Sequence, residues 1–129
     1  MVSTLQVEVS TVCTSHCIYC PVALYSDWRR EFMDFSLFQK IVQVSFTTNG
    51  LLLGRVAEDV AKVGVDVVAV TFAGATAETH NRVRVGNDFD TVLQNLKTFV
   101  KAVKNASAKT KIVAIYMMLK NTYRELPQF

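Results

Sequence analysis

Outside one short stretch the sequence contains no cysteine, since all three cysteines lie at positions 13, 17 and 20. An odd number of cysteines this close together cannot form a disulfide framework, and clustered reduced thiols are typical of the cytoplasm. The chain also lacks a long apolar run. The longest, Val65–Ala75, includes an aspartate and is much shorter than the roughly 20 residues that cross a bilayer. We therefore expect a cytoplasmic protein without a membrane span.

The sequence also lacks a large excess of either positive or negative charge. The 14 lysines and arginines exceed the 11 acidic residues by only three, and they are scattered along the chain, which argues against nucleic acid as a partner. No basic segment followed by an apolar block opens the sequence, so we expect no signal peptide. Repeats and low-complexity linkers are missing as well. With 129 residues, half of them apolar, the chain is expected to form one globular domain.

The three cysteines follow the spacing C-x3-C-x2-C. Thiolates this close together on one loop suit a metal centre. A structural zinc site takes four protein ligands, and an iron–sulfur cubane usually takes four cysteines. Cys13, Cys17 and Cys20 would therefore leave one metal position open, as catalysis requires. A zinc site completed by His16 or His80, or three plain free thiols, are the alternatives.

Strand-like and helix-like segments alternate along the chain. Strands are expected at Leu5–Ser10, Val44–Thr48, Val65–Phe72 and Lys111–Met118. Helices are expected from the capping box Ser36–Gln39 to Gln43, at Arg55–Val63, from Asp88 or Asp90 onward, and from Asn121 until Pro127. This order predicts an α/β fold with a mostly parallel sheet and right-handed crossovers, as part of an incomplete TIM-like (β/α) barrel.

Several of these elements carry more detailed expectations. Val65–Phe72 is almost continuously apolar, as in a strand buried on both faces. The helix that begins near Asp88 has the strongest helical period, with apolar residues at Val92, Leu93, Leu96, Phe99, Val100 and Val103. Gly64 is expected to end the preceding helix, whose buried face would consist of Val56, Ala57, Val60 and Ala61. One of Met117 and Met118 is expected in the core.

Further motifs accompany the cysteines. Tyr19 precedes the third cysteine and Pro21 follows it. Downstream, in order, come Phe32-Met33-Asp34-Phe35, Thr47-Thr48-Asn49-Gly50, Thr71-Phe72-Ala73-Gly74, His80-Asn81 and Arg84. Together with the cysteine spacing, this series resembles the radical S-adenosylmethionine (SAM) enzymes, and most of all the branch related to the SPASM-domain peptide-maturing enzymes. The resemblance extends over nearly the whole chain.

The resemblance implies two cofactors. Cys13, Cys17 and Cys20 would hold a 4Fe-4S cluster, and the amino and carboxylate groups of SAM would chelate its open iron. Tyr19 would lie against the adenine. Thr48 and Asn49 would line the SAM pocket, although Asn49 could instead only supply turn geometry. Thr71 would face the ribose or carboxylate of SAM. Arg84 would pair with that carboxylate, unless it forms a surface ion pair, and His80 would act as a structural cap.

The resemblance implies an oxidoreductase activity, the reductive cleavage of SAM to a 5′-deoxyadenosyl radical that is used on a peptide or small molecule. An electron donor such as flavodoxin or ferredoxin would be a partner. The sequence also departs from the family pattern. It contains no Gly-Glu pair, the motif that holds the amino group of SAM, and Ala73 stands where Asp often precedes the glycine.

The absence of that motif has a simple interpretation. Compared with the family pattern, a strand-helix unit of roughly 30 residues is expected to be missing near residues 43 and 44, and the chain stops inside the helix after its fourth strand. We therefore expect a partial radical SAM core domain over residues 1–129, with weakened SAM binding. The alternative is a non-catalytic zinc or iron–sulfur fragment, or an interaction module that pairs with a partner chain through open sheet edges. A third possibility is an unstable remnant without activity.

Overall fold

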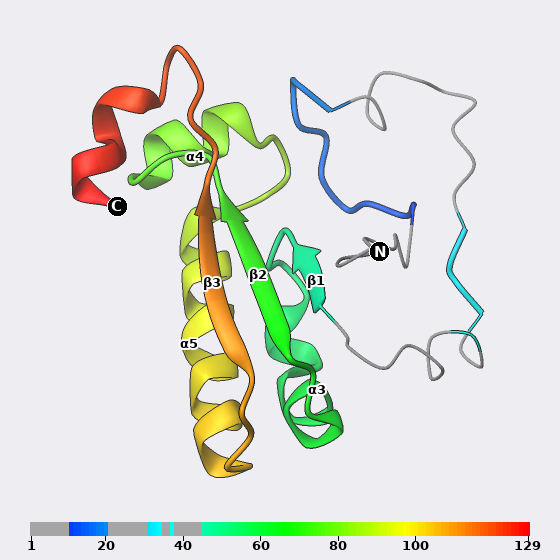
Figure 1. The fold of residues 1–129 in the computed structure, drawn as a ribbon. Coiled ribbons are helices and arrows are strands. Elements are labelled where there is room, and N and C mark those ends of the chain that lie inside the picture. Colours follow the sequence, from blue (N-terminus) through cyan, green and yellow to red (C-terminus); the bar gives the residue numbers. More distant parts are fainter. Residues whose placement is uncertain (1–10, 21–30, 35–36, 38–44) are drawn as a thin grey trace, which may run out of the picture.

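The structure is a computed structural model that describes residues 11–20, 31–34, 37 and 45–129. In chain order it contains β1 (Ser45–Thr48), the 3-10 turn η1 (Leu53–Arg55), α3 (Ala57–Val63), β2 (Val67–Phe72), α4 (Ala77–Val83), α5 (Phe89–Asn105), β3 (Lys111–Tyr116) and the 3-10 helix η2 (Tyr123–Gln128) (Figure 1). The strand predicted at Leu5–Ser10, and the helix predicted from Ser36 to Gln43 apart from Leu37, lie outside the described residues.

The three strands form a parallel sheet in the order β1-β2-β3. Ser45 lies opposite Val67, which in turn lies opposite Lys111, so the strands start at one level and their carboxyl ends share one edge. Figure 1 shows α5 running alongside β2 and β3 on one face of this sheet. The predicted α/β class with a parallel sheet is confirmed. Three strands with this order are consistent with part of a radical SAM (β/α) fold, and they do not show a barrel.

The core lies between the sheet and the two helices α3 and α5. Val68, Val70 and Phe72 alternate along β2 and pack with Val92 and Phe99 of α5. All five side chains are buried, and four of them have no exposed surface. On the other face of β2, Ala69 is buried too. The almost continuous apolar run therefore predicted a central strand correctly, although the strand starts at Val67 rather than Val65.

Helix α5 begins where one of the two candidate aspartates predicted. Asp88 has an extended backbone, and its carboxylate accepts hydrogen bonds from the main-chain N–H and the hydroxyl of Thr91. These bonds lower the pKa of Asp88, because they stabilise its ionised form. Asp90 lies inside the first turn, where its negative charge faces the positive end of the helix dipole.

Helix α3 is shorter than predicted. It starts at Ala57, after η1, and Gly64 ends it in the left-handed conformation (φ +76°), with its N–H donated to the carbonyl of Val60. The prediction that Val56 faces the core is wrong. Val56 stands before the helix as its N-cap and is exposed, because the preceding 3-10 turn ends at Arg55 and changes the direction of the chain.

Helix α4 was not predicted. Its seven residues include three polar and two charged side chains and offer no apolar period. What fixes its start is Thr76, whose hydroxyl accepts a hydrogen bond from the N–H of Thr79. Local polar caps of this kind favour a helix but are too short a signal to separate it from a turn.

The C-terminal part differs from prediction in two details. Strand β3 ends at Tyr116, so Met117 and Met118 follow it; Met117 is half-buried and Met118 is exposed. The helix expected from Asn121 is the 3-10 helix η2, which begins at Tyr123 and contains Pro127. Its Glu125 accepts hydrogen bonds from the Ala75 N–H and the Thr79 hydroxyl, which ties this segment to the start of α4.

Candidate cofactor site

The cysteine loop, residues 13–20, is attached to the segment that links α4 to α5. The N–H of His16 donates to the carbonyl of Val85 at 2.9 Å, and that of Ile18 to Val83 at 3.5 Å. The amide of Asn49, just beyond the carboxyl end of β1, reaches the same loop. The cysteine loop therefore lies near the carboxyl edge of the sheet, where α/β folds usually place their ligands.

The three thiols differ in their surroundings. Cys13 is exposed, Cys17 is buried and Cys20 is intermediate, and all three are free. The N–H of Cys20 donates to the carbonyl of Cys17 at 3.1 Å and closes a tight turn. Within the described ranges, no three His, Cys, Asp or Glu side chains converge as a metal-binding group. The loop thus supplies three suitable donors in eight residues, but it does not gather them around one point.

Tyr19 lies between two of these thiols in sequence and is close to one of them. Its hydroxyl lies near the side chain of Cys17, which acts on the pKa of the phenol. Burial raises the pKa of Tyr19 well above 10.0, the side chain of Cys17 raises it further, and the positive charge of Arg84 opposes both. Tyr19 is therefore a neutral phenol held beside the buried thiol, within electrostatic reach of Arg84.

Arg84 connects the ends of the first two strands. Its Nη1 donates to the hydroxyl of Thr71 at 2.6 Å and also to the Thr71 carbonyl. The Thr71 hydroxyl in turn donates to the carbonyl of Thr48 at 3.3 Å. Thr48 uses its own hydroxyl to accept the N–H of Gly50. Thr48, Thr71 and Arg84 therefore form one hydrogen-bonded group at the carboxyl ends of β1 and β2.

The charge of Arg84 is not compensated by this group. The side chain is 7% exposed, so the ion pair at the surface that we considered for it is wrong. Its Nε is buried without a hydrogen-bond partner, and within the described part of the chain no carboxylate pairs with it. A buried guanidinium in this state is costly unless an anion completes it. A carboxylate-bearing ligand would supply both the missing acceptor and the missing charge.

Asn49 supplies turn geometry, one of the two roles that the sequence left open to it, and it also contacts the cysteine loop. Its Oδ1 accepts the N–H of Leu51 at 3.1 Å, as in an Asx turn, and Gly50 follows with φ +82°. Its Nδ2 donates to the hydroxyls of Thr14 and Ser15 and approaches the sulfur of Cys13 at 3.9 Å. Asn49 thus fixes a turn and, through it, contacts the cysteine loop.

His80 is a buried structural residue. Its Nδ1 accepts the N–H of Ala73 at 3.3 Å, and its Nε2 bonds Oδ1 of Asn87 at 2.7 Å. Burial lowers the pKa of His80 below its ordinary 6.5, which outweighs the opposite effect of the bond to Asn87. Because both ring nitrogens are engaged, His80 cannot complete a zinc site in this arrangement. His16 is exposed, and its main chain rather than its ring joins the packing.

Sequence reasoning missed two residues of this site, Ser15 and Asn87. Both are buried, and the amide of Asn87 donates to the Ser15 hydroxyl at 3.3 Å and to the carbonyl of Asn49 at 3.2 Å. Ser15 lies within the cysteine motif, and nothing in the sequence distinguishes it from the other residues between the cysteines. Asn87 precedes the aspartate that caps α5 and resembles an ordinary loop residue.

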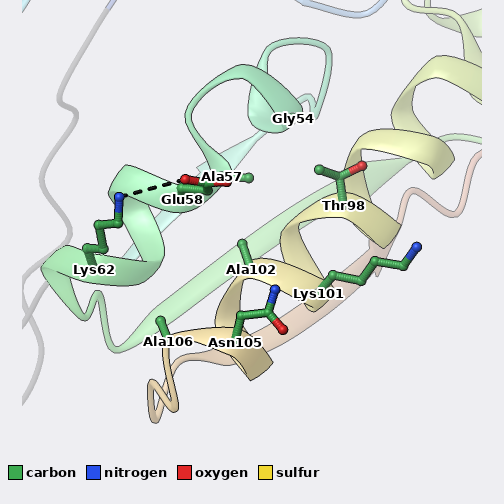
Figure 2. Close-up of a pocket in the computed structure, with 9 residues that line it drawn as sticks. All are labelled: Gly54, Ala57, Glu58, Lys62, Thr98, Lys101, Ala102, Asn105 and Ala106. Carbon is green, nitrogen blue, oxygen red and sulfur yellow. Dashed lines mark ion pairs between the residues drawn. The ribbon is translucent and has the colours of Figure 1, made fainter.

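A separate hollow of about 440 Å³ opens between α3 and α5, away from the cysteine loop (Figure 2). Its floor consists of small residues such as Ala57 and Ala102, and Lys101 and Asn105 stand at its side. Lys62 is paired with Glu58 at 3.7 Å across its rim. The lining contains none of the predicted site residues, so this hollow belongs to the helical layer and not to the candidate site.

Comparison with known proteins gives one family. The model of the radical SAM superfamily matches residues 24–129, which begins after the three cysteines and therefore does not depend on them. A search of curated proteins returned no match. No helix within the described ranges has the length and apolar character needed to span a membrane. The downstream strands and motifs that the match covers make up most of the protein, and the chain accordingly belongs to the radical SAM superfamily.

Proposed function

We propose that this chain holds a 4Fe-4S cluster through Cys13, Cys17 and Cys20 and binds SAM beside it. The observation that carries the proposal is Arg84, a buried cation with an orphaned Nε at the sheet edge to which the cysteine loop is attached. The carboxylate of SAM has the charge and acceptors that this side chain lacks. The donor set of three thiols fits a cluster with one open iron, once the loop closes around it.

Cys13, Cys17 and Cys20 would hold the cluster, which when reduced would supply the electron for reductive cleavage of SAM to methionine and a 5′-deoxyadenosyl radical. The protein's own contribution is binding and orientation. Arg84 would hold the carboxylate, with Thr71 and Thr48 keeping its guanidinium in place. Tyr19 would lie against the adenine. Asn49 would contribute indirectly, by holding the turn and the cysteine loop.

The missing Gly-Glu pair sets a limit on this function. The amino group of SAM would have no acidic partner from that motif, and we propose that SAM binds more weakly than in relatives that carry it. This agrees with a partial core domain over residues 1–129 that has lost a strand-helix unit near residues 43 and 44, within an incomplete barrel. A SPASM-related branch, a peptide substrate, and flavodoxin or ferredoxin as electron donor, in a cytoplasmic setting, complete the proposal by family analogy.

Anaerobic reconstitution with iron and sulfide, followed by EPR of the reduced protein with and without SAM, tests the proposal. A 4Fe-4S signal that changes on addition of SAM supports both the cluster and the SAM site. A cluster signal indifferent to SAM would support the thiol ligands and reject the SAM site. Cys17→Ser should lose the signal, whereas His16→Gln should retain it, since His16 is exposed.

A second candidate rests on the fact that the three thiols do not converge within the described residues. They would then bind zinc, or no metal, in a non-catalytic interaction module. Metal analysis separates the two candidates, because a cubane contains about four irons with sulfide and a structural site one zinc. A protein that takes up zinc at one equivalent and no iron would favour this reading.

A further inference from the structure

We infer that Asn87 is a positioning residue that anchors the cysteine loop to the sheet, and that His80 sets the direction of its amide. The inference rests on the proposed function for its significance, since it concerns how the ligand loop is held. The evidence for it is a set of hydrogen bonds among four buried or half-buried residues, Asn87, His80, Ser15 and Asn49.

His80 determines which way the amide of Asn87 points. The N–H of Ala73 can only donate, so Nδ1 of His80 must accept and Nε2 must carry the proton. That proton is donated to Oδ1 of Asn87 at 2.7 Å. The amide nitrogen of Asn87 is thereby directed to the opposite side, toward the cysteine loop. The order of donors and acceptors leaves one orientation in which every bond is satisfied.

The amide nitrogen of Asn87 then holds two separate chain segments. One proton goes to the hydroxyl of Ser15 at 3.3 Å and the other to the carbonyl of Asn49 at 3.2 Å. Ser15 lies midway between Cys13 and Cys17, and its N–H donates to the sulfur of Cys13 at 3.4 Å. Asn87 therefore joins the end of β1 to the part of the loop that spaces the first two thiols.

Burial makes this connection effective. Asn87 is 2% exposed, Ser15 6% and Cys17 5%, so water cannot easily replace a lost bond. Removal of the two donors of Asn87 should loosen the part of the loop around Ser15 and expose Cys17, although the main-chain bonds of His16 and Ile18 remain. Cys13 is exposed already and should change little. The relative reactivity of these two thiols reports on the anchoring within one molecule.

The chain offers a matched control in Asn95 of α5. Its Nδ2 also donates to two main-chain carbonyls, those of Gly50 at 3.0 Å and Leu51 at 2.7 Å. These carbonyls follow directly after Asn49, but no bond of Asn95 reaches the cysteine loop. Asn95→Asp and Asn87→Asp therefore remove the same kind of donor from adjoining carbonyls, and only the second change removes a donor that reaches the cysteine loop.

The experiment is alkylation of the metal-free, reduced full chain with iodoacetamide, with each cysteine followed by mass spectrometry. In Asn87→Asp we expect the Cys17-to-Cys13 rate ratio to rise roughly ten-fold, the scale of one lost buried hydrogen bond. Asn95→Asp should leave the ratio unchanged. A carboxylate near a thiol disfavours the reactive thiolate and slows its alkylation. The rise in the ratio must therefore come from a faster absolute rate at Cys17, because slower alkylation of Cys13 alone could come from the new charge.

A ratio that stays the same in a folded Asn87→Asp variant would overturn the inference. If that variant shows no cooperative melt, Ser15→Ala decides, because it removes the acceptor from the other side; a ratio that stays the same there would likewise reject the anchor. Iron and sulfide uptake by the unaltered chain reports separately on the proposed function. A chain that takes up no iron, yet shows the expected change in ratio, would reject the cluster and keep the anchor.

Discussion

Arg84 and Thr71 form a linked pair at the carboxyl end of β2, in which Nη1 of the arginine donates to both the hydroxyl and the carbonyl of the threonine. The pair orients the guanidinium but gives it no negative charge. The buried Nε has no hydrogen-bond partner and could donate to an anion.

Arg84→Lys should weaken SAM binding to the iron-loaded protein by roughly ten-fold or more, because lysine keeps the charge but cannot form a two-pronged contact with a carboxylate. Titration calorimetry under anaerobic conditions measures the change. Arg82→Lys is the control, since Arg82 is two residues away on α4 and exposed. Equal affinity of the Arg84 variant and the unaltered chain would rule out Arg84 as a carboxylate partner.

His80 should make the folded state sensitive to mild acid. Its pKa is lowered in the folded protein from an ordinary value of 6.5, chiefly by burial, so the unfolded chain takes up a proton first as the pH falls. The contribution of His80 to the free energy of unfolding should therefore be fully present above about pH 6.5. It should decline as the pH falls from there to the pKa of His80 in the folded protein.

Urea unfolding at a series of pH values between 7.5 and 5 tests this. His16→Gln, which removes the exposed histidine, should keep the decline, whereas His80→Gln should flatten it in this range. The lowered pKa of Glu125, caused first by its bond with Thr79, and that of Asp88 act in the same direction but at lower pH. A decline that persists in His80→Gln and disappears in His16→Gln would contradict the assignment.

Asp88→Ala should destabilise the protein by about 1 kcal/mol, the usual value of an N-cap. The substitution removes the acceptor for the N–H and hydroxyl of Thr91 and for the amide of Asn81. Asp90→Ala removes only a charge from the first turn and should have a smaller effect. Thermal melts of both variants provide the comparison, and an equal loss in the two would argue against a specific cap.

Gly74→Ala should be among the more harmful single-methyl additions in the chain. A Cβ at this position would lie 2.7 Å from the main-chain N of His80 and 2.9 Å from Cβ of Thr79, and neither atom can move away without shifting α4. We expect a loss of about 1–3 kcal/mol in unfolding free energy, measured by denaturant titration, with a rise in Cys17 alkylation because His80 moves.

Gly64→Ala is the comparison for that change. A Cβ at Gly64 meets nothing within 4 Å, so only the strain of its positive φ remains, of about 1–2 kcal/mol. The two variants can thus have similar stability, but only Gly74→Ala should alter the reactivity of Cys17. If Gly64→Ala altered it equally, the effect of Gly74 would be general destabilisation.

Much of the fold could be predicted because its signals are local. Asp88, followed by the periodic apolar residues of α5, places a helix start within one residue, and the αL conformation at Gly64 ends α3 as expected. The apolar run of β2 required a buried parallel strand. Where signals were short or polar, prediction was wrong: α4 was missed, and Val56 was placed in the core although η1 turns it outward.

For the candidate site, the sequence alone determined which donors exist and how closely they are spaced. These features can be recognised because their residues are neighbours in the chain, and their spacing alone predicts a cofactor site; they are the three thiols, Tyr19 and the Thr48-Asn49-Gly50 turn. The tertiary structure decided which distant groups complete them. Asn87 meets Ser15 across 72 positions, and Arg84 is buried with one nitrogen unpaired. Such contacts form because parallel strands bring their carboxyl ends to one edge of the sheet. The sequence does not predict them, because a single polar residue has no periodic pattern that indicates which distant residue it will contact.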